Sequence, residues 1–277
     1  IPHNRKEKHL RSNRYFGGIC LLVKHVILGI FDVTFVDKTT EGLLAVVFKD
    51  KSSDYSFMTI SVYLPPERSA WGRDSTSFFQ SVLQLVYEQS DCDAVYMMGD
   101  INSRVGDECD YLPEIEDLPN RKILDHSKNS HGKSLIHFLL ESKMCLVNGR
   151  LGKRDNFTCI DPGKGRSVVD YAIVPIDCFQ NCIDMEVKTS RELIQTHVLS
   201  KGLNIDRVSI PDHSMLRLTV RIVTPSHCSL LPEPPVTNVC DELSDKGFNE
   251  SHIYYKRYNV RNGTDDFSLS DDIKVLI

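Results

Sequence analysis

The chain has 277 residues, of which 41% are hydrophobic and 26% are charged, and its formal net charge is -5. This apolar content is sufficient for a buried core, so the composition excludes a disordered, coiled-coil or collagen-like chain. No apolar run approaches the ~20 residues of a membrane-spanning helix, because Lys24 and His25 interrupt the longest one. The length suits one large domain, alone or with an appendage, and no membrane partner is expected.

The negative charge is concentrated in the last part of the chain. Residues 224–277 account for -4 of the net charge and residues 1–223 for -1. In the larger part, Lys and Arg gather near the start of the chain and again over 150–166, where Lys153 and Arg154 lie. Such clusters could contact phosphate groups, although a solvated basic surface is the commoner outcome.

The nine cysteines do not form a recognisable framework. No C-x-x-C motif occurs, and Cys178 and Cys182 lack a second pair of ligands, so the spacing does not favour a zinc site. Cysteines in apolar runs, such as Cys20 and Cys145, are typical of small core residues. We therefore expect a reducing, intracellular environment, either nuclear or cytoplasmic.

Short apolar runs of strand-like composition occupy the first part of the chain. A helical pattern follows, in which apolar residues recur on one face and Ser75 is placed to cap the first turn. A further strand leads directly into Gly99-Asp100-Ile101-Asn102. The predicted strands are 18–24, 26–36, 43–49, 57–64 and 94–98, and the predicted helix is 75–90.

The second part of the domain continues this alternation. We expect a polar, acidic loop over 103–130, a helix capped by Ser130 that ends near Lys143, and a Gly- and Lys/Arg-rich loop over 149–166. The remaining predicted strands are 145–148, 168–174 and 215–223. Strands that alternate with helices and hairpins indicate an α/β domain.

The chain thus divides into three regions. Residues 1–15 are a basic lead-in without apolar periodicity, and residues 16–223 are the α/β domain. Residues 224–277 begin with a linker marked by four prolines and continue as an acidic, weakly periodic tail.

Polar side chains stand at or just beyond the ends of several predicted strands. Loops meet at one rim of an α/β sheet, so this placement indicates a shared site. The residues concerned are Tyr63, Asp100, Asn102, Asp170, Asp212 and His213.

Each of these residues also has an ordinary structural interpretation. Gly-Asp-x-Asn is a common turn in which the Asp and Asn side chains bond their own backbone. Asp212-His213 could be a capped turn, and Tyr63 could be an ordinary strand tyrosine. Asp170 differs, because a buried carboxylate in an apolar run is costly without a cationic, histidine or metal partner. Together these residue types are the parts of a Mg²⁺-assisted phosphoester hydrolysis site, although their spacing does not establish one.

The order of the motifs is similar to that of a known superfamily. The segments concerned are GGICLLVK at 17–24, VYLP at 62–65, MGDINSRVG at 98–106, RSVVDY at 166–171 and PDHS at 211–214. They resemble the endonuclease/exonuclease/phosphatase superfamily, and in particular the endonuclease domain of non-LTR (LINE-type) retrotransposons. The resemblance covers about residues 16–223.

This resemblance implies a four-layer α/β sandwich, with two packed mixed sheets flanked by helices and the site at one rim. It implies that Asp100 activates the attacking water or protonates the leaving group, and that Asn102 helps to position the phosphate. His213, oriented by Asp170, would contact the scissile phosphate. Asp212 would be a metal ligand and Tyr63 a phosphate contact.

The resemblance also implies the ligands of such a site. The substrate would be DNA, the cofactor Mg²⁺ or Mn²⁺, and a reverse transcriptase domain would follow in a longer polyprotein. The residues expected to line the site or flank the DNA backbone are Asn148, Thr158, Ser167, Lys153 and Arg154.

One part of the family pattern is not matched. The family carries an Asn and then a Glu, the principal Mg²⁺ ligand, upstream of the Gly-Gly strand, whereas only 16 residues precede Gly17 here. Glu7 lies in a basic stretch and is not assigned this role. We therefore expect the first strands to be missing, in a fragment or a degenerate copy, with metal binding and activity weakened or lost.

Three functions are consistent with these observations. The first is a Mg²⁺-dependent DNA endonuclease, reduced or inactive in this chain. The second is another phosphodiesterase or phosphatase of the superfamily, acting on a lipid or inositol phosphate. The third is a non-catalytic remnant that binds nucleic acid or protein.

Overall fold

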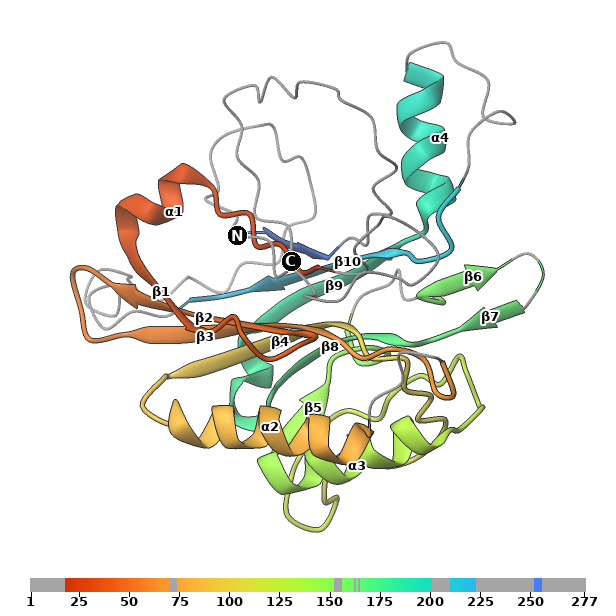
Figure 1. Ribbon diagram of the computed structural model, residues 1–277, viewed down its shortest axis with the longest axis horizontal. Coiled ribbons are helices and arrows are strands. Elements are labelled where there is room, and N and C mark those ends of the chain that lie inside the picture. The colour runs from red at the N-terminus through yellow and green to blue at the C-terminus, as the bar shows by residue number, and fades with distance from the viewer. Residues whose placement is uncertain are drawn as a thin grey trace, which may run out of the picture.

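A six-stranded mixed sheet forms the centre of the domain. The computed structural model describes residues 18–69, 74–151, 156–161, 163, 165–200, 210–222 and 252–255. The strands of the large sheet are β1 (Phe31–Asp37), β2 (Leu43–Asp50), β3 (Ser56–Tyr63), β4 (Ala94–Asp100), β8 (Asp170–Pro175) and β5 (Met144–Leu146), in this spatial order (Figure 1). β3 and β4 are parallel, and all other neighbouring pairs in this sheet are antiparallel.

Two helices cover one face of this sheet (Figure 1). Helix α2 (Ser75–Glu88) connects the parallel strands β3 and β4, which require a crossover, and α3 (Ser130–Ser142) lies beside α2. Phe79 of α2 and Phe138 of α3 stack with ring centroids 5.4 Å apart. Both rings belong to the apolar cluster between these helices and the sheet, so the predicted amphipathic helices are confirmed.

A smaller sheet packs against the opposite face of the large one. It consists of β11 (His252–Tyr255), β10 (Met215–Val220) and β9 (Cys182–Lys188), in this order and all antiparallel. Met185 and Leu218 of this sheet share an apolar cluster with Ala172 of β8. The two sheets therefore enclose a second core, as expected for a sandwich.

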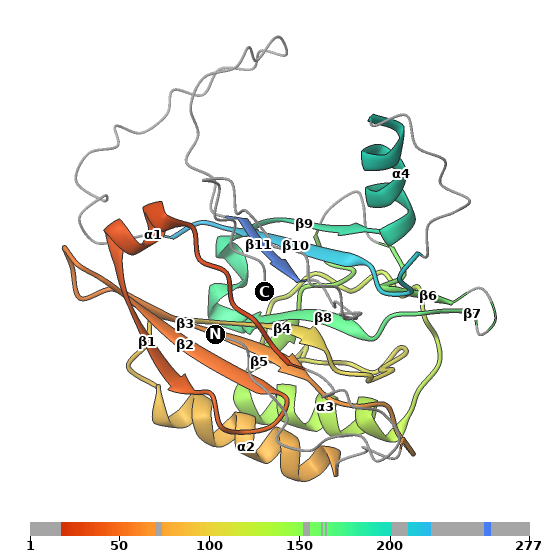
Figure 2. The same cartoon turned by 45° about the horizontal axis from the view of Figure 1, so that its top comes forward.

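Further helices lie on the side of the smaller sheet. Figures 1 and 2 show α1 (His25–Ile30) and α4 (Ser190–Ser200) on the other side of the large sheet from α2 and α3. The predicted α/β sandwich of two packed sheets with flanking helices is thus confirmed. Among the described residues, no helix is both long enough and apolar enough to cross a membrane.

The segment before β1 differs from the prediction. We expected strands over 18–24 and 26–36, but residues 18–24 form no strand and residues 25–30 form the short helix α1. β1 begins only at Phe31, whose ring packs edge-on against Phe48 and Phe57. None of the α1 residues is buried, so strand structure starts where core packing starts.

Three smaller differences concern caps and connections. The helices are capped one residue earlier than expected, by Asp74 and Asn129, whose side-chain oxygens accept backbone N–H bonds from the first turn. The predicted loop 149–166 contains a hairpin of β6 (Cys159–Asp161) and β7 (Gly165–Ser167), and a 3₁₀ helix, η1 (Ile176–Asn181), joins β8 to β9.

Several of the sequence predictions lie outside the described residues. These are the basic lead-in 1–15 with Glu7, the basic residues Lys153 and Arg154, and the tail 224–277 apart from β11.

The acidic loop 103–130 is anchored by a buried ionic cluster. Both carboxylate oxygens of Asp110 accept hydrogen bonds from Arg150, at 2.7 and 2.9 Å, and Arg121 donates a third at 3.1 Å. The backbone N–H of Leu146 donates a fourth at 2.8 Å. Because the side chains of Asp110 and Arg150 are each only 1% exposed, this pairing is needed to offset their desolvation. The cluster holds the loop that follows β4 against β5.

Candidate functional site

Three polar residues form a row at one rim of the large sheet. Tyr63 ends β3 and is paired in register with Asp100 at the end of β4, and Asp100 is paired in register with Asp170 at the start of β8. The carboxylates of Asp100 and Asp170 are both fully buried. The strand ends predicted to form a shared site are therefore adjacent in the sheet.

His213 closes this rim from the segment that precedes β10. Its Nδ1 lies 3.0 and 2.9 Å from the two carboxylate oxygens of Asp170. Its Nε2 lies 3.8 Å from Oδ2 of Asp100, and the imidazole side chain is only 8% exposed. The ring thus lies between two buried carboxylates on neighbouring strands.

The charge on His213 follows from these neighbours. Burial by itself lowers the pKa of His213, because it desolvates the imidazolium. The hydrogen bonds with Asp170 and Cys159 and the negative charges of Asp170 and Asp100 act in the opposite direction and raise this pKa to about 11. The ring is therefore protonated at neutral pH, and both of its nitrogens are donors.

The turn after β4 is held tightly. Asn102 has a left-handed backbone with φ 49°, its backbone N–H donates to Oδ1 of Asp100 at 3.2 Å, and its Nδ2 donates to the carbonyl of Leu64 at 2.9 Å. These are the turn bonds of the ordinary interpretation of Gly-Asp-x-Asn. They also place the half-buried Asn102 directly beside Asp100.

Gly99 allows β3 and β4 to approach each other just before this turn. Its φ is 156°, and a Cβ at this position would lie 1.9 Å from the carbonyl oxygen of Val62. Only glycine fits here without displacing β3. The close approach contributes to the alignment of Tyr63 with Asp100.

Thr158 and Asn148 lie next to Asp170, but their side chains are turned into the protein. Oγ1 of Thr158 accepts hydrogen bonds from the backbone N–H groups of Val169 and Asp170 at 2.9 and 3.0 Å. Nδ2 of Asn148 donates to the carbonyl of Asp170 at 3.1 Å, and its Oδ1 accepts from Ala172 N–H at 2.9 Å. These hydrogen bonds do not test the predicted contact of Thr158 and Asn148 with a substrate, which stays a prediction.

The two other predicted residues lie at the outer edge of the site. Ser167 is half-buried at the end of β7, where its carbonyl accepts the backbone N–H of Thr158 at 3.0 Å. Asp212 is exposed, and its carbonyl accepts the N–H of Ile160 at 2.7 Å. The β6–β7 hairpin is thereby joined to the segment that carries His213.

Two groups of donor atoms in the described part of the chain could hold a cation. One consists of Asp100, Asp170 and His213, and the other of Cys159, Asp212 and His213. The carboxylates of Asp100 and Asp170 thus lie together at this rim, but neither group fits Mg²⁺, which takes an oxygen shell and keeps several waters. In the first group the imidazole of His213 lies between the two carboxylates, and the second offers only one carboxylate beside a thiol and an imidazole.

Cys159 lies at the site, although the sequence analysis does not predict it as a site residue. It pairs with Ser167 in the β6–β7 hairpin and forms an isolated antiparallel bridge with His213. The available signal was the run Phe157-Thr158-Cys159-Ile160, whose aromatic and β-branched residues are typical of a strand. The surrounding Gly and Lys residues are typical of a loop, so this short strand was not predicted.

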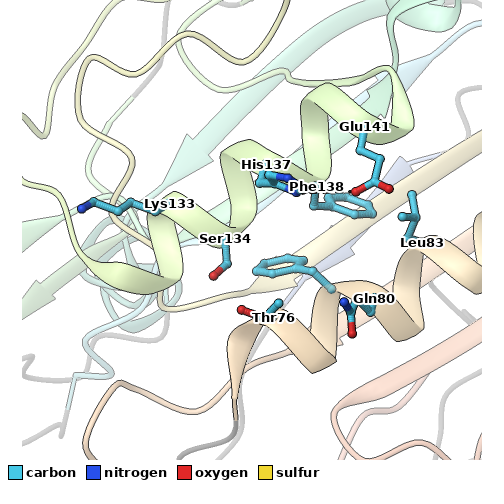
Figure 3. Close-up of a pocket in the computed structure, with 9 residues that line it drawn as sticks. Thr76, Gln80, Leu83, Lys133, Ser134, His137, Phe138 and Glu141 are labelled. Atoms are coloured by element: carbon cyan, nitrogen blue, oxygen red, sulfur yellow. Dashed lines mark ion pairs between the residues drawn. The ribbon is translucent and has the colours of Figure 1, made fainter.

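A hollow of about 300 Å³ lies elsewhere, between α2 and α3 (Figure 3). Thr76, Gln80 and Leu83 line it from α2, and Lys133, His137 and Glu141 line it from α3. None of the predicted site residues is among those that line it, so the hollow is separate from the rim that carries His213.

Comparison with solved structures shows resemblances in fold. The chain resembles the endonuclease domain of TRAS1, a telomere-specific non-LTR retrotransposon, with 17% sequence identity and a TM-score of 0.45 over 70% of each chain. It also resembles a 3′ phosphatase from Neisseria bound to a product DNA hairpin, with 15% identity and a TM-score of 0.42 over 70% of this chain and 71% of that one. An AP endonuclease from Archaeoglobus fulgidus shares 15% identity with a TM-score of 0.40, over 69% of this chain and 71% of that one.

No family model and no curated protein matches the sequence. The likeness is one of fold, and at these TM-scores it does not assign an activity to this chain.

Proposed function

We propose that this chain hydrolyses phosphodiester bonds in DNA, with its reacting groups at the rim that carries Asp100, Asp170 and His213. The observation that carries the proposal is the imidazole of His213 held between two buried carboxylates, at 2.9 Å from one and 3.8 Å from the other. A fixed positive donor beside a carboxylate suits a reaction in which a phosphate gains negative charge while water loses a proton.

Each residue has a distinct role in this proposal. The imidazolium of His213 donates from Nε2 to a non-bridging phosphate oxygen and stabilises the charge that develops there, because its pKa is too high for it to act as a base at neutral pH. Asp170 holds the ring through Nδ1 and compensates its charge. Asp100 accepts a proton from the attacking water as the water oxygen bonds to phosphorus and the bond from phosphorus to the leaving oxygen breaks, and the leaving oxygen takes its proton from solvent.

Four further residues contribute to substrate binding in this proposal, and Asp212 is proposed as a metal ligand by resemblance. Asn102 and Tyr63 flank Asp100 and are proposed to position the phosphate, and Asp212 is exposed beside His213. The basic residues Lys153 and Arg154 are proposed to contact the DNA backbone, where such contacts add affinity but little sequence information.

Dependence on Mg²⁺ or Mn²⁺ is proposed by resemblance. A divalent cation supplies charge stabilisation to a reacting phosphate when it is bound. The donor groups of the described residues do not form a site for Mg²⁺ by themselves, so the proposal predicts weak binding of the metal in the absence of DNA.

The retrotransposon type of the endonuclease is a further part of the proposal, and it would place a reverse transcriptase domain in the same polyprotein. It is supported by the order of the five motifs between residues 17 and 214. It predicts a preference for DNA over inositol phosphates and phospholipid headgroups.

A substrate comparison tests the proposed function. The protein is incubated with supercoiled plasmid, with a soluble inositol phosphate and with phosphoinositide vesicles, each with Mg²⁺, Mn²⁺ or EDTA. Nicked plasmid without phosphate release from the other two substrates is expected. Phosphate release without nicking would show that the site acts as a phosphatase and not as an endonuclease. No reaction with any substrate would favour a remnant that does not cut DNA.

A further inference from the structure

The peptide groups on both sides of Asp170 are held by buried side chains from outside β8. The hydroxyl of Thr158 accepts the N–H of Asp170 at 3.0 Å, and the amide of Asn148 donates to its carbonyl at 3.1 Å. The same two side chains also bind the neighbouring N–H groups of Val169 and Ala172. Four backbone groups around one carboxylate residue are thus bound by two side chains.

These contacts occupy the polar atoms of both side chains. Thr158 is 0% exposed and Asn148 is 5% exposed. A hydroxyl oxygen has two lone pairs, and both face backbone N–H groups here. The carboxamide of Asn148 uses its oxygen and its nitrogen on the backbone of β8. Because both side chains are also buried, neither is presented to a phosphate at the rim.

Thr158 also binds the segment that carries His213. Its carbonyl accepts the N–H of Ser214 at 2.6 Å, and its own N–H donates to the carbonyl of Ser167 at 3.0 Å. Thr158 therefore contacts the residue directly after His213 through its backbone and Asp170 through its side chain. The two members of the pair, which are 43 positions apart in the chain, share this one neighbour.

We infer that Thr158, with Asn148, is a positioning residue that fixes the backbone of Asp170 relative to His213 and so sets the geometry of their hydrogen bond, instead of binding the substrate. The expected effect on kcat rests on the proposed function, whereas the expected effect on the hydrogen bond between His213 and Asp170 does not. A displacement of Asp170 by a fraction of an ångström would misalign Nδ1 with the carboxylate and rotate Nε2 away from the position it holds beside Asp100.

The test compares two conservative changes of Thr158. Thr158→Val keeps the shape of the side chain but removes the acceptor, and Thr158→Ser keeps the acceptor but removes a methyl group. The matched control is Thr59→Val, which alters another buried threonine, in β3, whose hydroxyl lies 3.5 Å from the carbonyl of Val46. Thr158→Cys, with its weak sulfur acceptor, replaces the valine variant if that variant does not fold.

The first readout is the downfield proton resonance of Nδ1–H of His213 in the full chain, assigned by its loss in His213→Gln. The Thr158→Val protein is expected to lose or shift this resonance, whereas Thr158→Ser and Thr59→Val retain it. An unchanged resonance in folded Thr158→Val or Thr158→Cys protein would overturn the inference. This readout requires no activity, so it remains decisive if the chain does not cut DNA.

The second readout is the kinetics of nicking by the same variants. We expect kcat to fall by about 10- to 100-fold in Thr158→Val, the range for loss of a supporting hydrogen bond, with KM changed little. Thr158→Ser should restore kcat. A rise in KM at constant kcat would instead identify Thr158 as a substrate contact and overturn the positioning role, while leaving the proposed function intact.

Discussion

Both carboxylate oxygens of Asp170 lie within 3.0 Å of Nδ1 of His213, so one carboxylate orients the ring and compensates its charge. Asp170 is buried at the start of β8, and His213 precedes β10 in the other sheet. The pair therefore spans the two sheets of the sandwich, and its geometry depends on how they are packed.

The first prediction concerns the coupling within this pair. Asp170→Asn and His213→Gln should each reduce the nicking rate strongly, and the double variant should be little worse than either single one, because each change disables the same unit. Rates from a double-mutant cycle on supercoiled plasmid provide the measurement. Losses that multiply in the double variant would show that the two residues act separately.

The second prediction concerns acid stability. Burial raises the pKa of Asp110, but the hydrogen bonds and charge of Arg150 and the charge of Arg121 outweigh it and hold this pKa below its usual value. A lowered native pKa contributes stability above the unfolded value of about 3.9, and this contribution is lost as pH falls through the native pKa. Asp110→Asn should therefore destabilise the protein near pH 7 by about 3–5 kcal/mol, because it leaves Arg150 buried without its charge partner.

Urea unfolding of the Asp110 variant from pH 7 to pH 3 is the corresponding measurement. The difference from the wild-type protein should shrink as pH falls. The matched control is Asp107→Asn in the same loop, where the exposed ion pair with Lys128 predicts little change. A difference in stability that stays constant with pH would contradict this account of the cluster.

The third prediction concerns the approach of β3 and β4. Gly99→Ala should destabilise the fold by about 1–3 kcal/mol or more, because its Cβ would lie 1.9 Å from the carbonyl oxygen of Val62. Gly29→Ala is the matched control, since an added Cβ would meet no heavy atom within 4 Å beyond its chain neighbours and the backbone of its own helix, and its helical position favours alanine by about 0.5–1 kcal/mol. Thermal unfolding of both variants distinguishes them, and equal melting temperatures would contradict the packing described for Gly99.

The fourth prediction concerns thiol reactivity. Cys145 is fully buried, and burial raises its pKa to about 12, whereas Cys20 and Cys109 are exposed. Because the thiolate is the reactive form, iodoacetamide should label Cys20 and Cys109 much faster than Cys145 under native conditions. Peptide mass spectrometry over time measures each site, and early labelling of Cys145 would indicate that the core between the sheets opens.

The sequence alone predicts the main features of the fold because its apolar patterns are regular. The stacked Phe79 and Phe138 lie on faces that the helical periodicity already indicates. The sequence also predicts the chemical type of the partner of Asp170, because a carboxylate within a run of Val, Ala and Ile requires a cation, a histidine or a metal. The contact with His213 then depends on the packing of the two sheets.

Other features depend on information that a sequence pattern does not contain. The residues of α1 are largely β-branched and apolar, which favoured a strand, but their lack of burial leaves them outside the sheet. The direction of the Thr158 hydroxyl depends on how this residue, just before β6, packs against the start of β8 and the His213 segment, and the spacing of motifs in the sequence does not indicate it. For the same reason Cys159 was not associated with His213.

The proposal that this rim cuts DNA is tested most directly by nicking of supercoiled plasmid with Mg²⁺, comparing the wild-type chain with Asp100→Asn and the loop control Asp107→Asn. Asp100→Asn removes the carboxylate that accepts the proton of water but keeps the size of the side chain. A fall in the nicking rate of about 100-fold or more is therefore expected. Asp107→Asn should retain the wild-type rate. Nicking by Asp100→Asn at the wild-type rate would contradict the assignment of the reaction to this site.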